Sequence, residues 1–427
     1  MRGINKMQII ENNKIQEKIY IEKLSNGLKV IVIPKKTQKK YIIWGVNYGS
    51  IDHKFIVGDK EITVPDGIAH YMEHKLFEQE NGTNSLDVLS RIGVNANAYT
   101  TNNHTAYLFE DNNNKFFEAL DEFMNYVQNP YFTDENVEKE RGIIEQEIMM
   151  YDDYPDWKLY MNAMKAMYHK NPINIDVAGT KETIAEITKE KLYDAYNAFY
   201  RPDKMAIVVC GDFEPEKVIQ EIEKRMTLEN AKETVKRIYE EEPDDIVKDR
   251  IEAEMNISMP LFMIGYKDTK LHENQIKKDL ALEIIFNILI GDSTELYQDL
   301  YEQGILQSEP TFIYENSKTY SHALIQGQSQ QYNEVIAKLE EGIENLKQNG
   351  IKDDVFDRIK KKLYGEFVKS YNDAGNIATS FVQNYFREIN PLDYFEEFKG
   401  LDKEYTMQIL NDVFQKDKKV VSIVKSK

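Results

Sequence analysis

The sequence predicts an α+β protein made of two similar domains, a size that suits 427 residues. Short β-branched runs alternate with longer stretches of helical periodicity, which indicates sheets covered by helices. The order of elements in the first half returns in the second, as in an internal duplication. A stretch dense in charged residues separates the halves. We therefore place the domains at 1–235 and 250–427, with a charged linker at 236–249, and expect each domain to hold a mixed or antiparallel sheet packed with helices.

The first half opens with a polar segment, 1–18, which we interpret as a loose arm. After it, β-branched and aromatic runs favour strands. Pro65 introduces the first helix, Gly93 ends the second, and Thr133 caps a later one. The predicted strands are 28–33, 41–49, 94–100, 105–109 and 205–210. The predicted helices are the stretch after Pro65, 86–92, 114–127, 134–151, 161–167, 184–200 and 214–226.

The second half follows the same outline. Its predicted strands are 257–266, one around Phe312, 323–325 and 419–424. Its predicted helices are 279–290, 296–301, 333–346, 353–371 and 407–414. Helix 279–290 takes the place of the helix after Pro65 but has no histidine and no metal-binding pair. The second domain is therefore expected to have a structural role, as a wall, and to contain no active site of its own.

The composition excludes several classes of partner. The net charge of -19 argues against nucleic acid, because binding phosphate requires a basic surface. The single cysteine, Cys210, excludes an internal disulfide and lies in an apolar run, where it is expected to be a small buried hydrophobe. No apolar run approaches the length that spans a bilayer, so we expect no membrane partner. With its polar N-terminus, the chain is expected to be cytoplasmic.

The stretch from Gly67 to Phe77 contains the motif His-x-x-Glu-His. In a helix, His70 and His74 lie one turn apart on one face, and Glu73 projects beside them. Two neutral imidazoles, with a carboxylate that takes a proton from bound water, suit a zinc ion. The flanking residues are mostly apolar, so the helix is expected to be buried, and three buried polar groups need a cation as their partner. The motif is the inverted spelling of the zincin motif.

The predicted helix 134–151 offers an anionic third ligand. Glu140 and Glu147 are seven residues apart, which is two turns, so both share a face of this helix. Spacing alone does not choose between them. Another histidine, His104, stands at the edge of the turn before strand 105–109, and we interpret it as a turn residue rather than a ligand.

With this duplication and this motif, the chain resembles the pitrilysin or insulinase-type zinc peptidases, which include the mitochondrial processing peptidases. The resemblance covers about residues 20–425. The run HYMEHKLFE at 70–78 is most similar to short bacterial members, which have a single pair of domains. Further similar stretches lie at 97–100, 138–148, 200–205, 211–212 and 293–306.

The resemblance implies a processing-peptidase-like metallohydrolase fold and a role for each site residue. Glu147 would be the third zinc ligand, beside His70 and His74. Glu140 would be a supporting carboxylate on the same helix, and Glu73 would be the general base rather than a ligand. The cofactor implied is Zn2+.

The resemblance also implies how a peptide is bound. The strand with Asn97, Ala98 and Tyr99 would add an extended substrate to a sheet edge. Catalytic members hold the substrate carbonyl with an Arg and a Tyr, seven residues apart, from the domain without zinc. Tyr332 fits this Tyr, but Ile325 stands where the Arg is expected.

Arg387 and Tyr394 have the same spacing in a different context, so we give this pair little weight. The missing Arg suggests that a second chain, without zinc, supplies this group. The partner expected is either a second copy of the chain, in a homodimer, or a related chain without zinc, in a heterodimer. Because the family encloses its site in a chamber, the resemblance implies an endopeptidase for short or unfolded peptides. The alternative is a non-cleaving or partner-dependent peptide-binding subunit of a heterodimeric peptidase.

Overall fold

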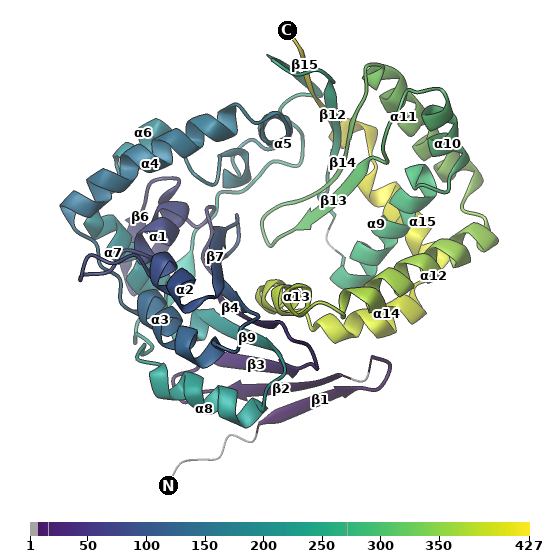
Figure 1. The fold of residues 1–427 in the computed structure, drawn as a ribbon. Coiled ribbons are helices and arrows are strands. Elements are labelled where there is room, and N and C mark those ends of the chain that lie inside the picture. Colours follow the sequence, from purple (N-terminus) through teal and green to yellow (C-terminus); the bar gives the residue numbers. More distant parts are fainter. Residues whose placement is uncertain (1–6, 16, 271) are drawn as a thin grey trace. The chain divides into compact units, whose positions relative to one another are not determined.

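The structure is a computed structural model that describes residues 7–15, 17–270 and 272–427. Its fold is α+β, as predicted, and it divides into two compact units (Figure 1). Unit 1 contains the described residues of 1–148, 176–238 and 368–391. Unit 2 contains the described residues of 149–175, 239–367 and 392–427.

The units exchange segments between the two halves of the sequence. The chain passes from unit 1 to unit 2 after Ile238, inside the predicted linker 236–249. Segment 149–175 of the first half nevertheless belongs to unit 2, and segment 368–391 of the second half belongs to unit 1. The sequence prediction did not include this exchange. The bounds of the two homologous domains themselves stay a prediction.

Unit 1 is built on a seven-stranded mixed sheet in the order β1-β2-β3-β9-β4-β8-β7. Within it β3 and β9 are parallel, and the other neighbouring strands are antiparallel. A separate three-stranded sheet has the order β10-β5-β6. The strands of unit 1 are β1 (Gln8–Asn12), β2 (Glu17–Lys23), β3 (Lys29–Pro34), β4 (Lys40–Val46), β5 (Lys54–Val57), β6 (Lys60–Thr63), β7 (Asn95–Thr100), β8 (Thr105–Asp111), β9 (Met205–Gly211) and β10 (Val235–Arg237).

Helices cover both faces of the large sheet. On one face, the ring of Trp44 in β4 lies 6.3 Å from that of Phe123 in α3, within an apolar cluster that also includes Met72 of α1. On the other face, α13 contacts β4 and β9, as Figure 1 shows. The helices of unit 1 are α1 (Ile68–Leu76), α2 (Ser85–Ile92), α3 (Phe116–Gln128), α4 (Asp134–Asp152, up to residue 148), α6 (Lys181–Ala185), α7 (Lys189–Phe199), α8 (Pro215–Arg225) and α13 (Ala374–Phe386).

Unit 2 is built on a five-stranded sheet in the order β11-β15-β12-β14-β13, and α5 contacts β12 and β15. Its strands are β11 (Arg250–Met255), β12 (Leu261–Lys267), β13 (Thr311–Asn316), β14 (Ser321–Gln328) and β15 (Lys419–Ser426). Its helices are α5 (Pro155–Met167), α9 (Gln275–Ile290), α10 (Glu295–Glu302), α11 (Tyr332–Asn349), α12 (Asp353–Ser370, up to residue 367), α14 (Tyr394–Gly400) and α15 (Lys403–Val413). None of the helices in the described part of the chain combines the length and apolar character needed to cross a membrane.

The strand order shows the predicted repeat. Five strands of unit 1, β3-β9-β4-β8-β7, correspond one to one to β11-β15-β12-β14-β13 of unit 2. The first pair in each series is parallel, and the following pairs are antiparallel. A glycine stands in the third strand of each series, Gly45 in β4 and Gly265 in β12.

Both glycines give room to the exchanged helices. A Cβ at Gly45 would lie 2.6 Å from a methyl of Val382 and 2.7 Å from the ring of Phe386, both in α13. A Cβ at Gly265 would lie 2.6 Å from the terminal methyl of Met167 in α5. In each unit, a helix from the other half of the sequence therefore packs against a glycine of the sheet.

Replacing Gly45 by Ala is expected to lower the free energy of unfolding by about 1–3 kcal/mol, because the added methyl overpacks the contact with α13. The matched control is Gly365→Ala in α12, where an added Cβ meets nothing within 4 Å. This control should raise stability by about 0.5–1 kcal/mol, the helix preference for Ala. Urea unfolding of the variants measures both effects, and an unchanged midpoint for Gly45→Ala would mean that α13 does not pack tightly on this sheet.

Several sequence predictions differ from the structure, and the following differences are the largest. The predicted loose arm is wrong for Gln8–Asn12, which pairs with β2, while residues 1–6 and 16 lie outside the described residues. The predicted helix 184–200 is interrupted because the side chain of Thr188 caps a new helix, α7. Helices α13 and α14 were not predicted.

Candidate metal centre

Helix α1, which carries the His-x-x-Glu-His motif, lies in the interior of unit 1. It begins after Gly67, whose φ of 89° lies in the left-handed region, and a Cβ there would lie 2.4 Å from the carbonyl oxygen of Ala178. Only glycine fits both conditions. The helix is buried over most of its length, including His70 and Glu73. The polar groups of the motif are therefore held in an otherwise apolar helix, as the flanking residues predicted.

The two histidines of α1 converge on one carboxylate of α4. The Nε2 atom of His70 lies 3.6 Å from Oε1 of Glu147, and the Nε2 atom of His74 lies 3.4 Å from its Oε2. One potential ligand atom from each of these residues falls within 4.8 Å of the others. Among the described residues, no other group of three His, Cys, Asp or Glu side chains is arranged in this way.

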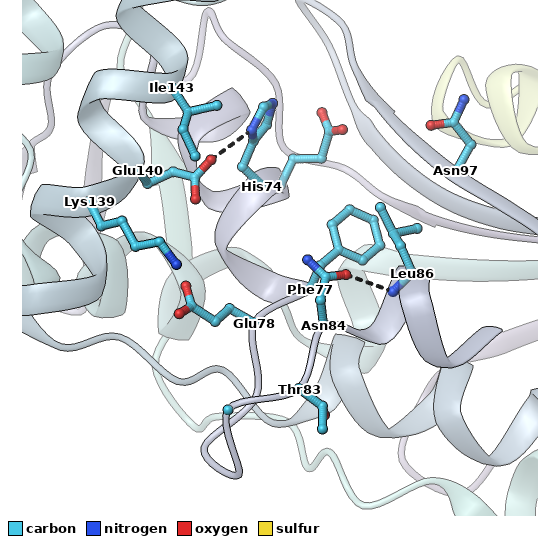
Figure 2. Close-up of a pocket in the computed structure, with 12 residues that line it drawn as sticks. His74, Phe77, Glu78, Thr83, Asn84, Leu86, Asn97, Lys139, Glu140 and Ile143 are labelled. Carbon is cyan, nitrogen blue, oxygen red and sulfur yellow. Dashed lines mark hydrogen bonds and ion pairs between the residues drawn. The ribbon is translucent and has the colours of Figure 1, made fainter. Parts of the chain in front are cut away.

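The second glutamate of α4 supports one of the histidines. Oε1 of Glu140 lies 3.1 Å from Nδ1 of His74 (Figure 2). This contact keeps Nδ1 of His74 protonated and orients the ring so that Nε2 faces Glu147. In contrast, the buried Nδ1 of His70 has no hydrogen-bond partner among the described residues.

The electrostatics of this cluster favour a positive charge. Burial opposes the charged imidazole of His74, but hydrogen bonds to Glu140 and Glu147 outweigh it and raise the pKa of His74 to about 10. Hydrogen bonds from His70 and His74 hold the pKa of Glu147 well below its usual value. Burial acts to raise the pKa of Glu140, but the contact with His74 outweighs it and the net shift is downward. The two carboxylates thus stabilise positive charge on the imidazole of His74.

The donor set and its spacing fit zinc. Zinc is bound by imidazole nitrogen and carboxylate oxygen at about 2.0–2.2 Å, so neighbouring ligand atoms of a tetrahedral site stand about 3.4 Å apart. The two contacts between imidazole and carboxylate, 3.6 Å to Oε1 and 3.4 Å to Oε2 of Glu147, are close to this separation, and one ligand atom from each residue lies within 4.8 Å of the others. Three protein ligands are also the number typical of a catalytic zinc site.

The glutamate of the motif has a different environment from the possible ligands. Oε2 of Glu73 accepts a hydrogen bond of 2.6 Å from the hydroxyl of Thr100, at the end of β7. Burial raises the pKa of Glu73 above its usual value, although the two histidines and Thr100 act against this shift. A carboxylate with a raised pKa is a stronger base than one in solution. The contact with Thr100 was missed by the sequence analysis, because only the fold brings β7 beside α1.

The predicted substrate strand lies at a sheet edge. Asn97, Ala98 and Tyr99 belong to β7, the last strand of the seven-stranded order, which pairs with β8 alone among the described strands. These three residues immediately precede Thr100, the hydrogen-bond partner of Glu73. An edge strand offers unpaired backbone groups to an extended chain.

A pocket of about 400 Å³ opens beside Glu73 and His74 (Figure 2). Its apolar lining comes from Phe77, Leu86 and Ile143, and Asn97 reaches it from β7. Its remaining lining residues are Glu78, Gly82, Thr83, Asn84, Lys139 and Glu140. A space of this size beside His74 is large enough for an amino-acid side chain.

The structure places the remaining predicted residues as follows. Tyr332 is the first residue of α11 in unit 2, and its contact with substrate stays a prediction. Ile325 is buried in β14, opposite Ile264 and Phe312. His104 lies in the turn before β8, where Nδ1 is 3.0 Å from the hydroxyl of Thr101 and burial lowers the pKa of the imidazole to about 4.

Arg387 follows the last residue of α13 in unit 1, whereas Tyr394 begins α14 in unit 2 and donates a hydrogen bond to Asp279. This pair therefore does not share a helix or a unit.

A buried His-x-x-Glu-His helix in a duplicated α+β fold is the arrangement of the inverzincin class. Residues 60–181 match the family model described as insulinase (peptidase family M16), and residues 186–363 match the model described as the peptidase M16 inactive domain. An uncharacterized zinc protease of Bacillus subtilis, YmfH, is 34% identical over 423 residues, covering 96% of this chain and 97% of that protein. The chain belongs to the M16, or insulinase, family of peptidases.

Solved structures share the fold over nearly the whole chain. A crystal structure described as an M16-like peptidase from Alicyclobacillus acidocaldarius has a TM-score of 0.92 at 29% identity, with 98% of this chain and 100% of that chain covered. A protease from Helicobacter pylori has a TM-score of 0.82 at 18% identity, covering 98% and 99%. The second likeness shows the fold alone.

Proposed function

We propose that the chain is a zinc-dependent endopeptidase that hydrolyses short or unfolded peptides. The convergence of the His70 and His74 imidazoles on the Glu147 carboxylate carries this proposal. These three residues would hold the zinc ion. When bound there, zinc supplies Lewis-acid chemistry, which lowers the pKa of water and polarises a peptide carbonyl. The names of the relatives, which are described as zinc proteases, support the same choice of metal.

Glu73 is the general base in this proposal. The hydroxyl of Thr100 occupies Oε2, which leaves Oε1 to take the proton from the attacking water and to return it to the leaving amine. Burial raises the pKa of this carboxyl, which strengthens it as a base. Glu140 does not touch the reacting atoms here; it keeps the proton on Nδ1 of His74.

The substrate would bind as an additional strand along β7. Backbone groups of Asn97, Ala98 and Tyr99 would pair with it, and the pocket beside His74 would take one of its side chains. Strand addition requires an extended backbone, which short and unfolded peptides offer and folded proteins do not. The resemblance assigns Tyr332 to substrate binding as well.

A second candidate function follows from Ile325. The resemblance places an Arg there to bind the substrate carbonyl, but a buried isoleucine has no group that donates a hydrogen bond. The chain would then act as the partner-dependent subunit of a heterodimeric peptidase, with a related chain supplying the missing arginine. A homodimer would not supply it.

Cleavage of a mixed library of unstructured peptides by the purified chain tests the proposal. We expect the zinc-loaded chain to cut peptides, a chelator to stop the reaction, and added zinc to restore it. Bound zinc without cleavage would contradict self-sufficient activity and favour the partner-dependent subunit. Failure to bind zinc would contradict both candidates.

A further inference from the structure

Lys75 is a buried cation at the edge of the proposed zinc site. It follows His74 directly in α1, and its side chain has an exposed fraction of 0%. Lysine is almost never fully buried unless it is paired, because removing an ammonium from water carries a large desolvation penalty. The other residues buried around it in α1 include Met72 and Leu76, so an apolar side chain would suit the same position. The lysine must therefore be stabilised by specific partners.

The partners of Lys75 are two carboxylates. Its ammonium donates a hydrogen bond to Oε2 of Glu78 and lies 3.7 Å from Oε2 of Glu140. The other oxygen of Glu140, Oε1, is the atom that contacts Nδ1 of His74 at 3.1 Å. Glu140 thus divides its two oxygens between a proposed zinc ligand and a buried cation.

We propose that Lys75 is a positioning residue of the zinc site, which acts by holding the Glu140 carboxylate in the orientation that directs His74. This inference rests on the proposed zinc site. The carboxylate of Glu140 has a partner at each oxygen, which restrains its plane from turning away from the imidazole. Because Nδ1 of His70 has no such support among the described residues, the geometry of the ligand pair depends on this one chain of contacts.

The simpler alternative is that Lys75 only neutralises Glu78, which lines the pocket. A double-mutant cycle separates the two roles. In the wild-type background, Lys75→Met is expected to weaken zinc binding about tenfold, the lower end of the effect of supporting residues in metal sites. In a Glu140→Gln background, the same substitution should change zinc affinity less than about twofold, because the residue that transmits its effect is already altered.

Competition with a chromophoric chelator measures these affinities, and denaturant unfolding of the metal-free variants measures stability separately. Glu78→Gln is the control, and we expect it to leave zinc affinity within about twofold of the wild type. The visible absorption of the cobalt-loaded protein reports ligand geometry, so it should change in Lys75→Met and not in Glu78→Gln. If Lys75→Met does not fold, Lys75→Gln serves instead, since it removes the charge and keeps a polar side chain.

Each outcome decides a different question. Equal losses of affinity for Lys75→Met in both backgrounds, or unchanged affinity in the wild-type background, would overturn the positioning role. A loss in Glu78→Gln as large as in Lys75→Met would assign the effect to Glu78 and would overturn it as well. Absence of zinc binding by the wild type would instead overturn the proposed function itself.

Discussion

Glu73→Gln is expected to reduce kcat for peptide hydrolysis by about 10²–10⁴-fold, the contribution of a positioned general base. The amide of glutamine cannot take a proton from water, but its oxygen can still accept the hydrogen bond from Thr100. The substitution therefore removes the base without removing a contact that shapes the site. Because Glu73 is not a proposed ligand, zinc should remain bound at one equivalent.

The measurement is the rate of cleavage of a peptide that the wild type cuts, together with the zinc content of both proteins. The combination of bound zinc and lost turnover is specific to a base. Retained turnover would show that another group takes the proton. Loss of zinc along with activity would indicate that Glu73 is a ligand, and the roles of Glu73 and Glu147 would then have to be reassigned.

The second large effect concerns the metal. Glu147→Gln is expected to weaken zinc binding by more than about 100-fold, because loss of a residue that only supports a ligand already costs 10–100-fold. Glu147 supplies the carboxylate on which both imidazoles converge, His70 at Oε1 and His74 at Oε2, and an amide oxygen is a poorer zinc ligand than a carboxylate. Activity should fall in proportion to bound zinc and return partly at high zinc concentration.

The matched control is Glu145→Gln, two residues earlier on the same helix and outside the group of possible ligands. It should bind zinc as the wild type does. Equilibrium dialysis followed by elemental analysis gives the zinc content of both variants. If Glu147→Gln kept wild-type affinity, or if both variants lost zinc equally, the assignment of Glu147 as a ligand would be wrong.

Local patterns were sufficient to predict much of unit 1. The strands found as β3, β4, β7, β8 and β9 were predicted within a few residues, because runs of β-branched and aromatic side chains favour strands. The spacing of His70 and His74 predicted their common face, since a helix brings residues four apart together. The convergence of these imidazoles agrees with that prediction.

Long-range contacts could not be predicted in the same way. Spacing placed Glu140 and Glu147 on one face of α4, but the choice between them depends on which imidazole nitrogens each carboxylate faces, which local sequence does not contain. Glu140 faces Nδ1 of His74, whereas Glu147 faces Nε2 of both histidines. The contact of Thr100 with Glu73 depends equally on the pairing of distant elements. Lys75 could have been recognised as unusual from the sequence alone, because a lysine beside His74 in an apolar helix is expected to be buried and to need a partner.

The exchange of helices was missed for a related reason. Helix α13 has a recognisable start, since the side chain of Asp373 caps it, and apolar residues at Ile377, Ala378, Phe381 and Val382 have helical spacing. The helix itself was therefore predictable. Its packing on β4, more than 300 residues earlier, was not, because the complementary feature is only a glycine, Gly45.

The most direct test of the zinc site is anomalous diffraction at the zinc edge from crystals of the zinc-loaded chain. We expect one strong peak within about 2.0–2.2 Å of Nε2 of His70, Nε2 of His74 and a carboxylate oxygen of Glu147, with Glu73 near the ion but not bound to it. A peak bound by other residues, or none between α1 and α4 in a protein that contains one equivalent of zinc, would contradict the account.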